Sequence, residues 1–206
     1  TAFTNISDID LAAGDDNAII SATGSLSGTL KGGDGTDDLF LNNSRNVINV
    51  DQTGSGNLIG NFDDLNYGNV SSIQTDFDGF EVIRLDDGSD IANLTFDAST
   101  EKTTKQSLRI DGGNGFDSIN LSLNSKEHQY LITTNQLENL KAYLESPNGK
   151  DATFNFLQTS LTLSGLEQGS LTIKKENSST TFIRGNSIYT SVDGDNWIKA
   201  EENANK

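Results

Sequence analysis

Along most of the chain, short apolar runs alternate with clusters rich in Gly and Asp. Four such clusters occupy residues 13–17, 32–37, 86–90 and 111–117. The apolar runs that follow them occupy residues 18–20, 39–41, 91–96 and 119–123. Glycine provides the positive φ values of tight turns, and alternating β-forming residues provide the pleated segment after the turn. The pattern therefore predicts a repeated unit of one turn and one short strand.

Further strand-like runs indicate that both halves of the chain return to one stack of strands. These runs occupy residues 47–50, 79–85, 94–96, 108–110, 160–166 and 170–173. Long polar segments separate these runs. An all-β fold, an irregular right-handed parallel β-solenoid or β-roll over residues 1–173, accounts for the whole pattern.

One short helix and a C-terminal meander complete the predicted fold. Residues 133–136 resemble a capping box, and three Leu residues follow at helical spacing, so we expect a helix near 134–146. It would pack on the solenoid flank or cover an open end. Residues 174–200 contain β-rich runs separated by Gly-Asn and Asp-Gly-Asp, which predicts an antiparallel hairpin or meander cap. A flexible tail is expected over 201–206.

The composition excludes several kinds of partner. The 206 residues include 30 Asp and Glu but only 14 Lys and Arg, a formal net charge of −16, which disfavours nucleic acid and anionic membrane surfaces. No apolar run approaches the ~20 residues of a membrane-spanning helix. The absence of Cys excludes disulfides and thiolate metal sites. The chain begins at Thr1 without a charged-then-apolar leader, which we interpret as a mature form or an excised region.

The acidic residues concentrate in the first half of the chain. Residues 1–100 contain 16 Asp and one Glu against three basic residues. Such a density of carboxylates destabilises a compact state unless a cation lies among them. A well-solvated acidic surface is the plain alternative, but the placement of Asp beside Gly in turns favours the cation.

Two of the clusters fit one nine-residue template. Residues 32–40 and 112–120 both read G-G-x-G-x-D-x-U-x, where U is a large aliphatic residue. The template resembles the RTX nonapeptide, the repeat of secreted calcium-binding toxins, proteases, adhesins and surface-layer proteins of Gram-negative bacteria. The resemblance implies a turn whose backbone carbonyls and sixth-position Asp bind Ca²⁺, followed by a strand of a parallel β-roll. The chain departs from the family because a long stretch of other sequence separates its two copies, which in the family stand in tandem.

The departure means that other turns must complete each calcium site. Ca²⁺ takes six to eight oxygen ligands, more than one turn readily offers. The acidic turn at 14–17 precedes the first nonapeptide turn, and residues 88–90 precede the second, each at about the spacing of one coil. We hypothesise two sites, one using Asp15, Asp16, Asp34 and Asp37, the other Asp86, Asp87, Asp90, Asp111 and Asp117, with Gly32, Gly35 and Asn114 of the nonapeptides as further candidates. The alternative is Asx turns in which each carboxylate caps its own backbone.

Catalytic motifs are scarce. His128 is the only His, which excludes a three-His or HExxH zinc site, and no G-x-S-x-G pattern surrounds a Ser. The single Pro, Pro147, follows Ser146, so self-cleavage at an Asp-Pro bond, known in some RTX proteins, has no substrate here. Carboxylate pairs for glycoside hydrolysis remain open. We expect a protein that is not an enzyme.

Taken with the resemblance, these observations predict a calcium-stabilised structural module of a secreted, extracellular bacterial cell-surface protein. A surface-layer protein or an adhesin, folding or assembling on Ca²⁺ outside the cell, is the preferred interpretation. Besides calcium, the possible partners in this role are other copies of the chain, in a surface lattice, and a cell-surface glycan. Binding of nucleic acid and insertion into a membrane are not expected. The alternative is a polysaccharide-binding or polysaccharide-cleaving β-helix module, with a catalytic base from Lys102, Lys105, Arg109 or later.

Overall fold

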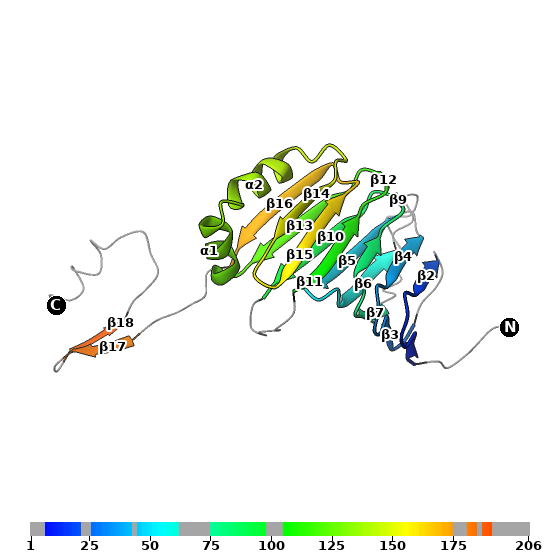
Figure 1. Ribbon diagram of the computed structural model, residues 1–206, viewed down its shortest axis with the longest axis horizontal. Coiled ribbons are helices and arrows are strands. Elements are labelled where there is room, and N and C mark those ends of the chain that lie inside the picture. The colour runs from blue at the N-terminus through cyan, green and yellow to red at the C-terminus, as the bar shows by residue number, and fades with distance from the viewer. Residues whose placement is uncertain are drawn as a thin grey trace. The chain divides into compact units, whose positions relative to one another are not determined.

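The computed structural model describes residues 7–21, 26–42, 45–61, 75–97, 105–174, 181–184 and 187–190. The chain divides into two compact units, Thr1–Lys174 and Lys175–Lys206. The described residues are mostly in β-strands, with two short helices, so the predicted all-β class is confirmed (Figure 1).

Two sheets form the body of the first unit. The eight-stranded sheet contains, in spatial order, β1 (Ile9–Asp10), β3 (Thr29–Lys31), β7 (Thr75–Asp78), β6 (Gly56–Asn61), β5 (Asn46–Asp51), β10 (Ile91–Phe96), β13 (Ser118–Leu123) and β16 (Gln168–Ile173). The six-stranded sheet contains β14 (Ala152–Asn155), β15 (Thr159–Ser164), β11 (Gln106–Asp111), β8 (Val82–Arg84), β4 (Asp38–Asn42) and β2 (Asn17–Ser21). A small parallel pair, β9 (Asp87–Gly88) and β12 (Asn114–Gly115), lies in the turns between them.

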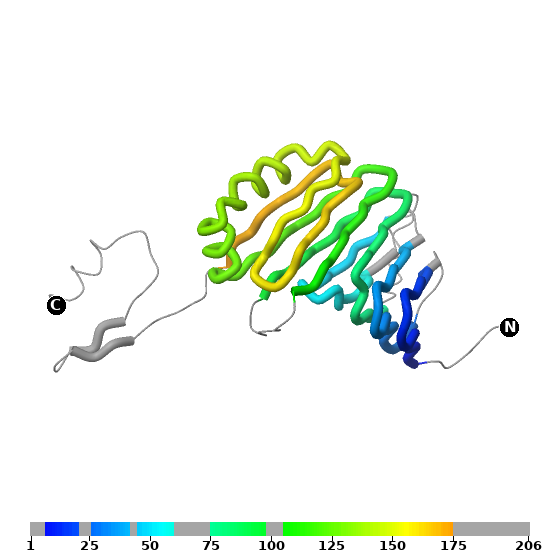
Figure 2. Tube along the Cα trace, in the orientation of Figure 1, coloured from blue at the N-terminus to red at the C-terminus, as the bar shows by residue number. Residues whose placement is uncertain are grey.

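The chain passes back and forth between these sheets, so strands distant in sequence lie side by side (Figure 2). Strands β10, β13 and β16 are parallel neighbours in the eight-stranded sheet, as are β4, β8 and β11 in the six-stranded sheet. Two strands interrupt this arrangement. β6 lies antiparallel between β5 and β7, and β14 lies antiparallel on β15. Both sheets are therefore mixed.

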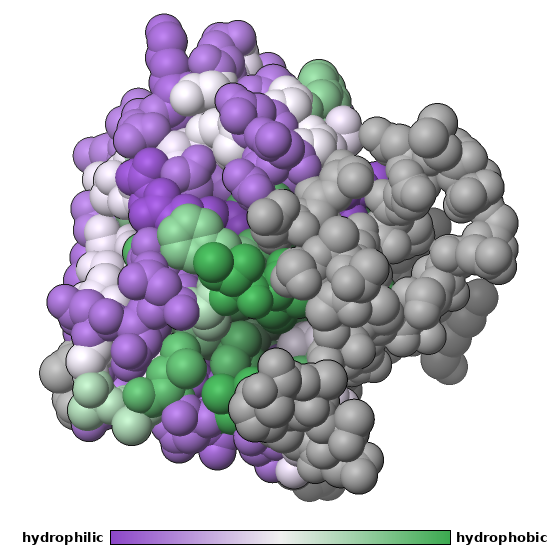
Figure 3. All heavy atoms as spheres, turned by 90° about the vertical axis from the view of Figure 1, so that its right-hand side faces the viewer, coloured by the Kyte–Doolittle hydropathy of each residue, from purple (hydrophilic) through white to green (hydrophobic). Residues whose placement is uncertain are grey.

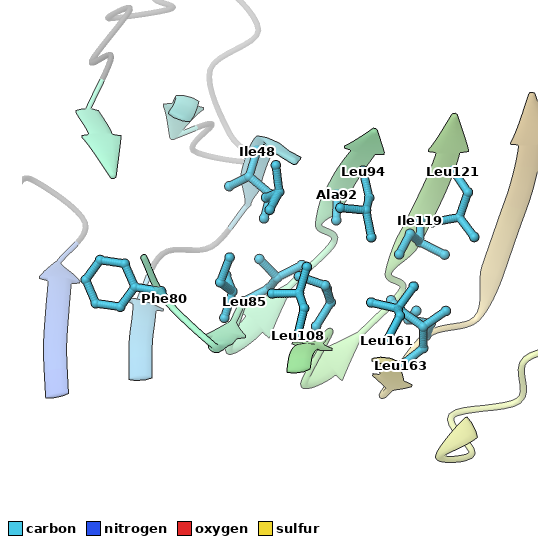
Figure 4. Close-up of a cluster of buried hydrophobic side chains, with 14 of the residues drawn as sticks. Ile48, Phe80, Leu85, Ala92, Leu94, Leu108, Ile119, Leu121, Leu161 and Leu163 are labelled. Atoms are coloured by element: carbon cyan, nitrogen blue, oxygen red, sulfur yellow. The ribbon is translucent and has the colours of Figure 1, made fainter. Parts of the chain in front are cut away.

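The core lies where the inward faces of the two sheets meet (Figure 4). Like residues form columns across neighbouring strands: Ile48, Ala92 and Ile119 are paired in the eight-stranded sheet, and Leu108 and Leu161 are paired in the six-stranded sheet. All five are at most 2% exposed. The period-two alternation of the strand sequences places these side chains on one face, which is why the sheets pack together.

The two nonapeptides occupy different kinds of turn. Residues 32–37 connect β3 of the eight-stranded sheet to β4 of the six-stranded sheet, whereas residues 112–117 connect β11 back to β13. Although the chain passes in opposite directions through the two turns, their local sequences are alike.

The helical region holds two helices where the sequence predicted one. Helix α2 (Leu137–Glu145) lies within the expected range, but Gln136 at its N-cap makes no side-chain capping bond, so the predicted capping box at 133–136 is wrong. Helix α1 (Ser125–Thr133) was missed, although Asn124 followed by Glu127 is itself a capping pattern. The Asn124 side chain accepts a hydrogen bond from the Glu127 N–H at 2.9 Å. Neither helix is long and apolar enough to cross a membrane.

Both helices pack on the end of the first unit that carries β16. Leu137, Leu140 and Leu144 of α2 are buried, and α2 contacts β16. The buried Glu127 of α1 accepts a hydrogen bond from the N–H of Leu157 at 3.0 Å, which ties α1 to the turn between β14 and β15. The helices therefore cover one end of the core.

The outward surfaces of the first unit differ in chemistry. On the eight-stranded sheet the side-chain amides of Asn49, Asn93 and Asn120 form a ladder, with Asn120 donating to Asn93 at 2.9 Å and Asn93 to Asn49 at 3.2 Å. On the side where β2 lies, apolar side chains gather in a patch bordered by hydrophilic ones (Figure 3). Ile19 of β2 is 68% exposed.

The described residues of the second unit form an antiparallel hairpin, β17 (Thr181–Arg184) and β18 (Ser187–Thr190). It falls within the meander predicted over 174–200. The part of the predicted meander after residue 190 and the tail over 201–206 lie outside the described residues.

Candidate functional site

The turns that connect the two sheets lie on top of one another in two stacks. The first stack, between the eight-stranded and the six-stranded sheet, consists of residues 11–16, 32–37 and 79–81. The second stack, between the six-stranded and the eight-stranded sheet, includes residues 85–90, 112–117 and 165–167. Backbone hydrogen bonds join neighbouring turns: Asp34 N–H donates to Ala12 O at 2.8 Å, and Asn114 N–H donates to Asp86 O at 2.9 Å.

Glycine makes this close stacking sterically allowed. Gly35 and Gly115 have φ values of +152° and +143°. A Cβ on Gly35 would overlap the carbonyl oxygen of Gly14 in the turn below, and one on Gly115 would overlap that of Gly88. The Gly-x-Gly pattern of each nonapeptide therefore allows backbone of one turn to lie directly against backbone of the next.

In the first stack, carboxylates hold each turn to its neighbour. Asp37 Oδ1 accepts a hydrogen bond from the N–H of Asp16 at 2.9 Å. The N–H of Asp37 in turn donates to Glu81 Oε2, also at 2.9 Å. These residues form a ladder across three turns, in which each carboxylate binds the backbone of the preceding turn.

The second stack contains a longer ladder of the same kind. Asp90 Oδ1 accepts from the N–H of Asn46, and Asp117 Oδ1 accepts from the N–H of Asp90 at 2.8 Å. Glu167 Oε2 accepts from the N–H of Asp117 at 2.8 Å. The sixth-position Asp of each nonapeptide thus lies in the middle of a ladder.

The second oxygen of four ladder carboxylates is buried without a hydrogen-bond partner. Among the described residues, Oδ2 of Asp16, Asp37, Asp90 and Asp117 lacks any donor. The side chains of Asp37, Asp90 and Asp117 are fully buried. Burying a carboxylate oxygen without a partner costs several kcal/mol, so a cation beside these oxygens would stabilise the fold.

The pKa values of three ladder carboxylates show the cost of burial. Burial raises the pKa of Asp90 to about 7; the Asn46 N–H opposes the rise, and the charge of Asp117 adds to it. Burial also raises the pKa of Asp117 to about 6, with the charge of Glu167 adding to the rise. The pKa of Glu81 is raised by burial too, and the charge of Asp37 contributes.

The structure brings together several of the pairs expected from the sequence. Asp16 and Asp37 share the first ladder, and Asp90 and Asp117 share the second. Asp15 Oδ1 accepts from the N–H of Thr36 at 2.9 Å. The acidic turn before each nonapeptide is therefore its neighbour in the stack, as the spacing predicted.

The remaining acidic candidates lie nearer the surface. Asp34 and Asp86 are exposed, and the exposed Asp87 accepts from the Asn114 side chain at 2.9 Å. Asp111 Oδ2 lies 3.4 Å from both the Arg84 and the Arg109 guanidinium.

Sequence reasoning missed Glu81 and Glu167, which end the two ladders. Both stand in the same three-residue pattern, Gly-apolar-Glu, at Gly79-Phe80-Glu81 and Gly165-Leu166-Glu167. They were missed because neither Glu lies in a Gly-Asp cluster. The shared Gly-apolar-Glu pattern is the signal that would have identified them.

The chemistry of these turns fits a hard cation. The available donors are carboxylate and backbone carbonyl oxygens, which suit Ca²⁺. Within the described residues, no group of three or more Asp, Glu, His or Cys side chains converges in a way that could hold a metal. A site here must therefore include backbone carbonyls. Comparison of the chain with protein-family models, curated proteins and solved structures finds no match.

Proposed function

We propose that the chain is a calcium-stabilised structural module of a secreted bacterial cell-surface protein, without enzymatic activity. In this proposal its first unit is an irregular right-handed parallel β-solenoid related to the RTX β-rolls. The observation that supports it best is the set of four buried carboxylate oxygens without a hydrogen-bond partner, all in stacked Gly-rich turns.

Calcium accounts for the unpartnered carboxylate oxygens and for their position in stacked Gly-rich turns. Ca²⁺ accepts carboxylate and carbonyl oxygens in flexible geometry, and two adjacent turns offer both. Asp16 and Asp37 of the first stack would hold one ion, and Asp90 and Asp117 of the second would hold another, together with carbonyls of the same turns. The ions would neutralise carboxylates that burial and mutual repulsion otherwise destabilise.

The proposed mechanism is folding by charge neutralisation. At the low Ca²⁺ concentration of a cytoplasm, the turns repel one another and the chain remains loose for export. At millimolar Ca²⁺ outside the cell, the ions join turn to turn. Free Ca²⁺ at about 100 times Kd would contribute roughly 2.7 kcal/mol per site to the free energy of unfolding.

The cellular role rests on the RTX resemblance of residues 32–40 and 112–120. A surface-layer protein or an adhesin would meet millimolar Ca²⁺ only outside the cell, where the module would fold or assemble. The partners that fit this role are other copies of the chain, in a lattice, and a surface glycan. Light scattering of the protein with and without Ca²⁺ tests self-association.

A thermal melt tests the calcium proposal. We expect a large rise in Tm when millimolar CaCl₂ replaces chelator, and little change with MgCl₂, because Mg²⁺ demands near-ideal octahedral geometry that carbonyl-rich turns rarely supply. The same Tm in chelator and in CaCl₂ would show that the turns are stable without the ion and would refute the proposal.

A further inference from the structure

The two ends of the first unit are covered differently. At the end that carries β14 and β16, helix α2 contacts β16, and its Tyr143 ring lies edge-on against Phe154 of β14, with ring centroids 5.5 Å apart. At the opposite end, β1 and β2 are the last strands of their sheets, and within the described part of the chain no strand pairs with their outer edges. Apolar side chains are exposed at this end (Figure 3). The longer of the two strands, β2, therefore has a free edge.

The apolar side chains of β2 are less covered than those of the strand beside it. Ala18 and Ile20, on the inward face, are each 8% exposed, whereas their partners in β4, Leu39 and Leu41, are completely buried. On the outward face, Ile19 is 68% exposed, more than any other large apolar side chain that the structure describes. A strand added at the edge of β2 would cover these three side chains.

The edge of β2 also lacks the features that usually protect a free strand. Native proteins block such edges with Lys, Pro or a β-bulge. The five residues of β2 read Asn-Ala-Ile-Ile-Ser and pair with β4 in continuous register. Addition of an extended segment to an unprotected edge is a common way in which proteins bind peptides, because the backbone of the segment continues the sheet.

The carboxylate ladder of the first stack ends beside this edge. Asp37 accepts the N–H of Asp16, and Glu81 accepts that of Asp37, so each of these carboxylates binds the backbone of the preceding turn. Residues 11–16 form the first described turn of this stack, and Asp16 stands directly before β2. Its buried Oδ2 has no donor among the residues that the structure describes. A donor at the start of an added strand would serve the Asp16 carboxylate as Asp16 serves Asp37.

The charge around the edge is negative. Residues 7–21 contain four Asp and no Lys or Arg. Asp8, Asp10 and Asp15 are exposed, and Lys31 of β3 stands opposite Asp10 in the sheet. A segment that carries Lys or Arg beside its apolar residues complements this charge, whereas an acidic segment, such as the same strand of a second copy, is repelled.

We propose that the outer edge of β2 binds an extended strand of another protein, with alternating apolar side chains and with Lys or Arg at the end next to residues 15–16. The strand continues the six-stranded sheet through its backbone, and its apolar side chains cover Ala18, Ile19 and Ile20. This inference goes beyond the proposed function and does not depend on bound calcium, because the free edge and the exposed side chains belong to the chain itself.

Because the partner is unidentified, a synthetic peptide serves as the probe. It consists of two Lys followed by alternating Val and Thr, with blocked ends and a fluorescent label. A second peptide has Glu in place of both Lys, and a third has a methyl group on every backbone nitrogen of the Val and Thr residues, which prevents pairing with a strand. Fluorescence anisotropy in millimolar CaCl₂ gives the Kd of each peptide. Hydrogen exchange of residues 17–21 locates the binding.

The variant Ile19→Lys removes the exposed apolar side chain and places a protecting Lys on the edge. Its matched control is Ile132→Lys, the same change at a residue of α1 that is 44% exposed. We expect I19K to weaken binding of the Lys peptide at least about tenfold, through lost apolar contact and repulsion. The variant I132K should keep the affinity within about twofold. The Glu peptide and the methylated peptide should also bind at least about tenfold more weakly to the unchanged protein.

Protection of residues 17–21 from hydrogen exchange by the Lys peptide would support the proposal independently of I19K, whose fold is checked by its thermal melt. The proposal is wrong if the Lys peptide does not bind, if the methylated peptide binds equally well, or if I19K and I132K bind alike. Size-exclusion chromatography with light scattering tests the remaining occupant: an unchanged protein that dimerises while I19K stays monomeric would assign the edge to a second copy and refute the proposed partner.

Discussion

The pH dependence of stability without calcium tests the buried carboxylates directly, because the protein must then hold them without a counter-ion. Burial raises the pKa of Asp90 from 3.8 to about 7 and that of Asp117 from 3.8 to about 6. In the unfolded chain both groups ionise near pH 4. Between these limits the folded state binds more protons than the unfolded state, so the free energy of unfolding falls as the pH rises from about 4 to about 7.

The size of this fall follows from the shifts. One pKa unit corresponds to about 1.4 kcal/mol, so Asp90 alone would account for roughly 4 kcal/mol. The charge of Asp117 contributes to the shift at Asp90, so the costs of the two groups do not simply add. In proteins, relaxation and water penetration generally reduce the cost of a buried charge. We expect a decrease of about 2–4 kcal/mol across this range.

Urea unfolding in metal-free buffer at about pH 5 and about pH 8 measures the change. Repulsion among exposed carboxylates also lowers the free energy of unfolding as the pH rises. The variant Asp117→Asn is therefore compared with the exposed control Glu145→Gln. D117N should reduce the pH dependence, and E145Q should leave it nearly unchanged. In millimolar CaCl₂ the dependence should flatten, because the ion holds the carboxylates ionised. A metal-free protein that is more stable at about pH 8 than at about pH 5 would refute the reasoning.

Four further substitutions, of which Leu157→Ala is a control, test other contacts of the first unit by urea unfolding. Gly112→Ala should destabilise the protein by more than about 3 kcal/mol, because its Cβ would overlap the Gly165 carbonyl oxygen; a loss below about 1 kcal/mol would contradict the close approach. Leu140→Ala in α2 should cost about 2–5 kcal/mol, whereas Leu157→Ala, 41% exposed, should cost much less; equal effects would mean that α2 does not cover the core. Asn93→Ala should cost about 1 kcal/mol because it removes two side-chain hydrogen bonds, one to Asn49 and one from Asn120. No measurable loss would show that this row of Asn side chains is not stabilising.

Local turn chemistry made part of this structure predictable from the sequence. The spacing between the first two Gly-Asp clusters predicted that their turns are neighbours, and the structure pairs Asn17 with Asp38 directly after them. The spacing between the later two clusters likewise predicted the pairing of Gly88 with Gly115. Glycine positions identify such turns because backbone approaches backbone there and no other residue fits.

Features that depend on long-range contacts were not predictable. The antiparallel β6 occupies a place between β5 and β7 that its own sequence does not specify. A nonapeptide has the same local chemistry whichever sheet the chain is leaving, so the different settings of residues 32–37 and 112–117 left no trace in the sequence. The ion pair of Asp111 in β11 with Arg84 in β8 arises from strands that are neighbours only in the fold.

In both ladders, the contact between neighbouring turns does not depend on the length of chain that connects them. Successive ladder residues are 21 and 44 residues apart in the first stack, and 44, 27 and 50 apart in the second. Yet Asp16, Asp37, Asp90 and Asp117 all donate their N–H over 2.8–2.9 Å. Segments of different lengths have therefore been accommodated without altering the contact between turns. Evolution or protein engineering can therefore lengthen a segment between two turns, or insert a new helix or strand into it, while the stacked turns keep their geometry.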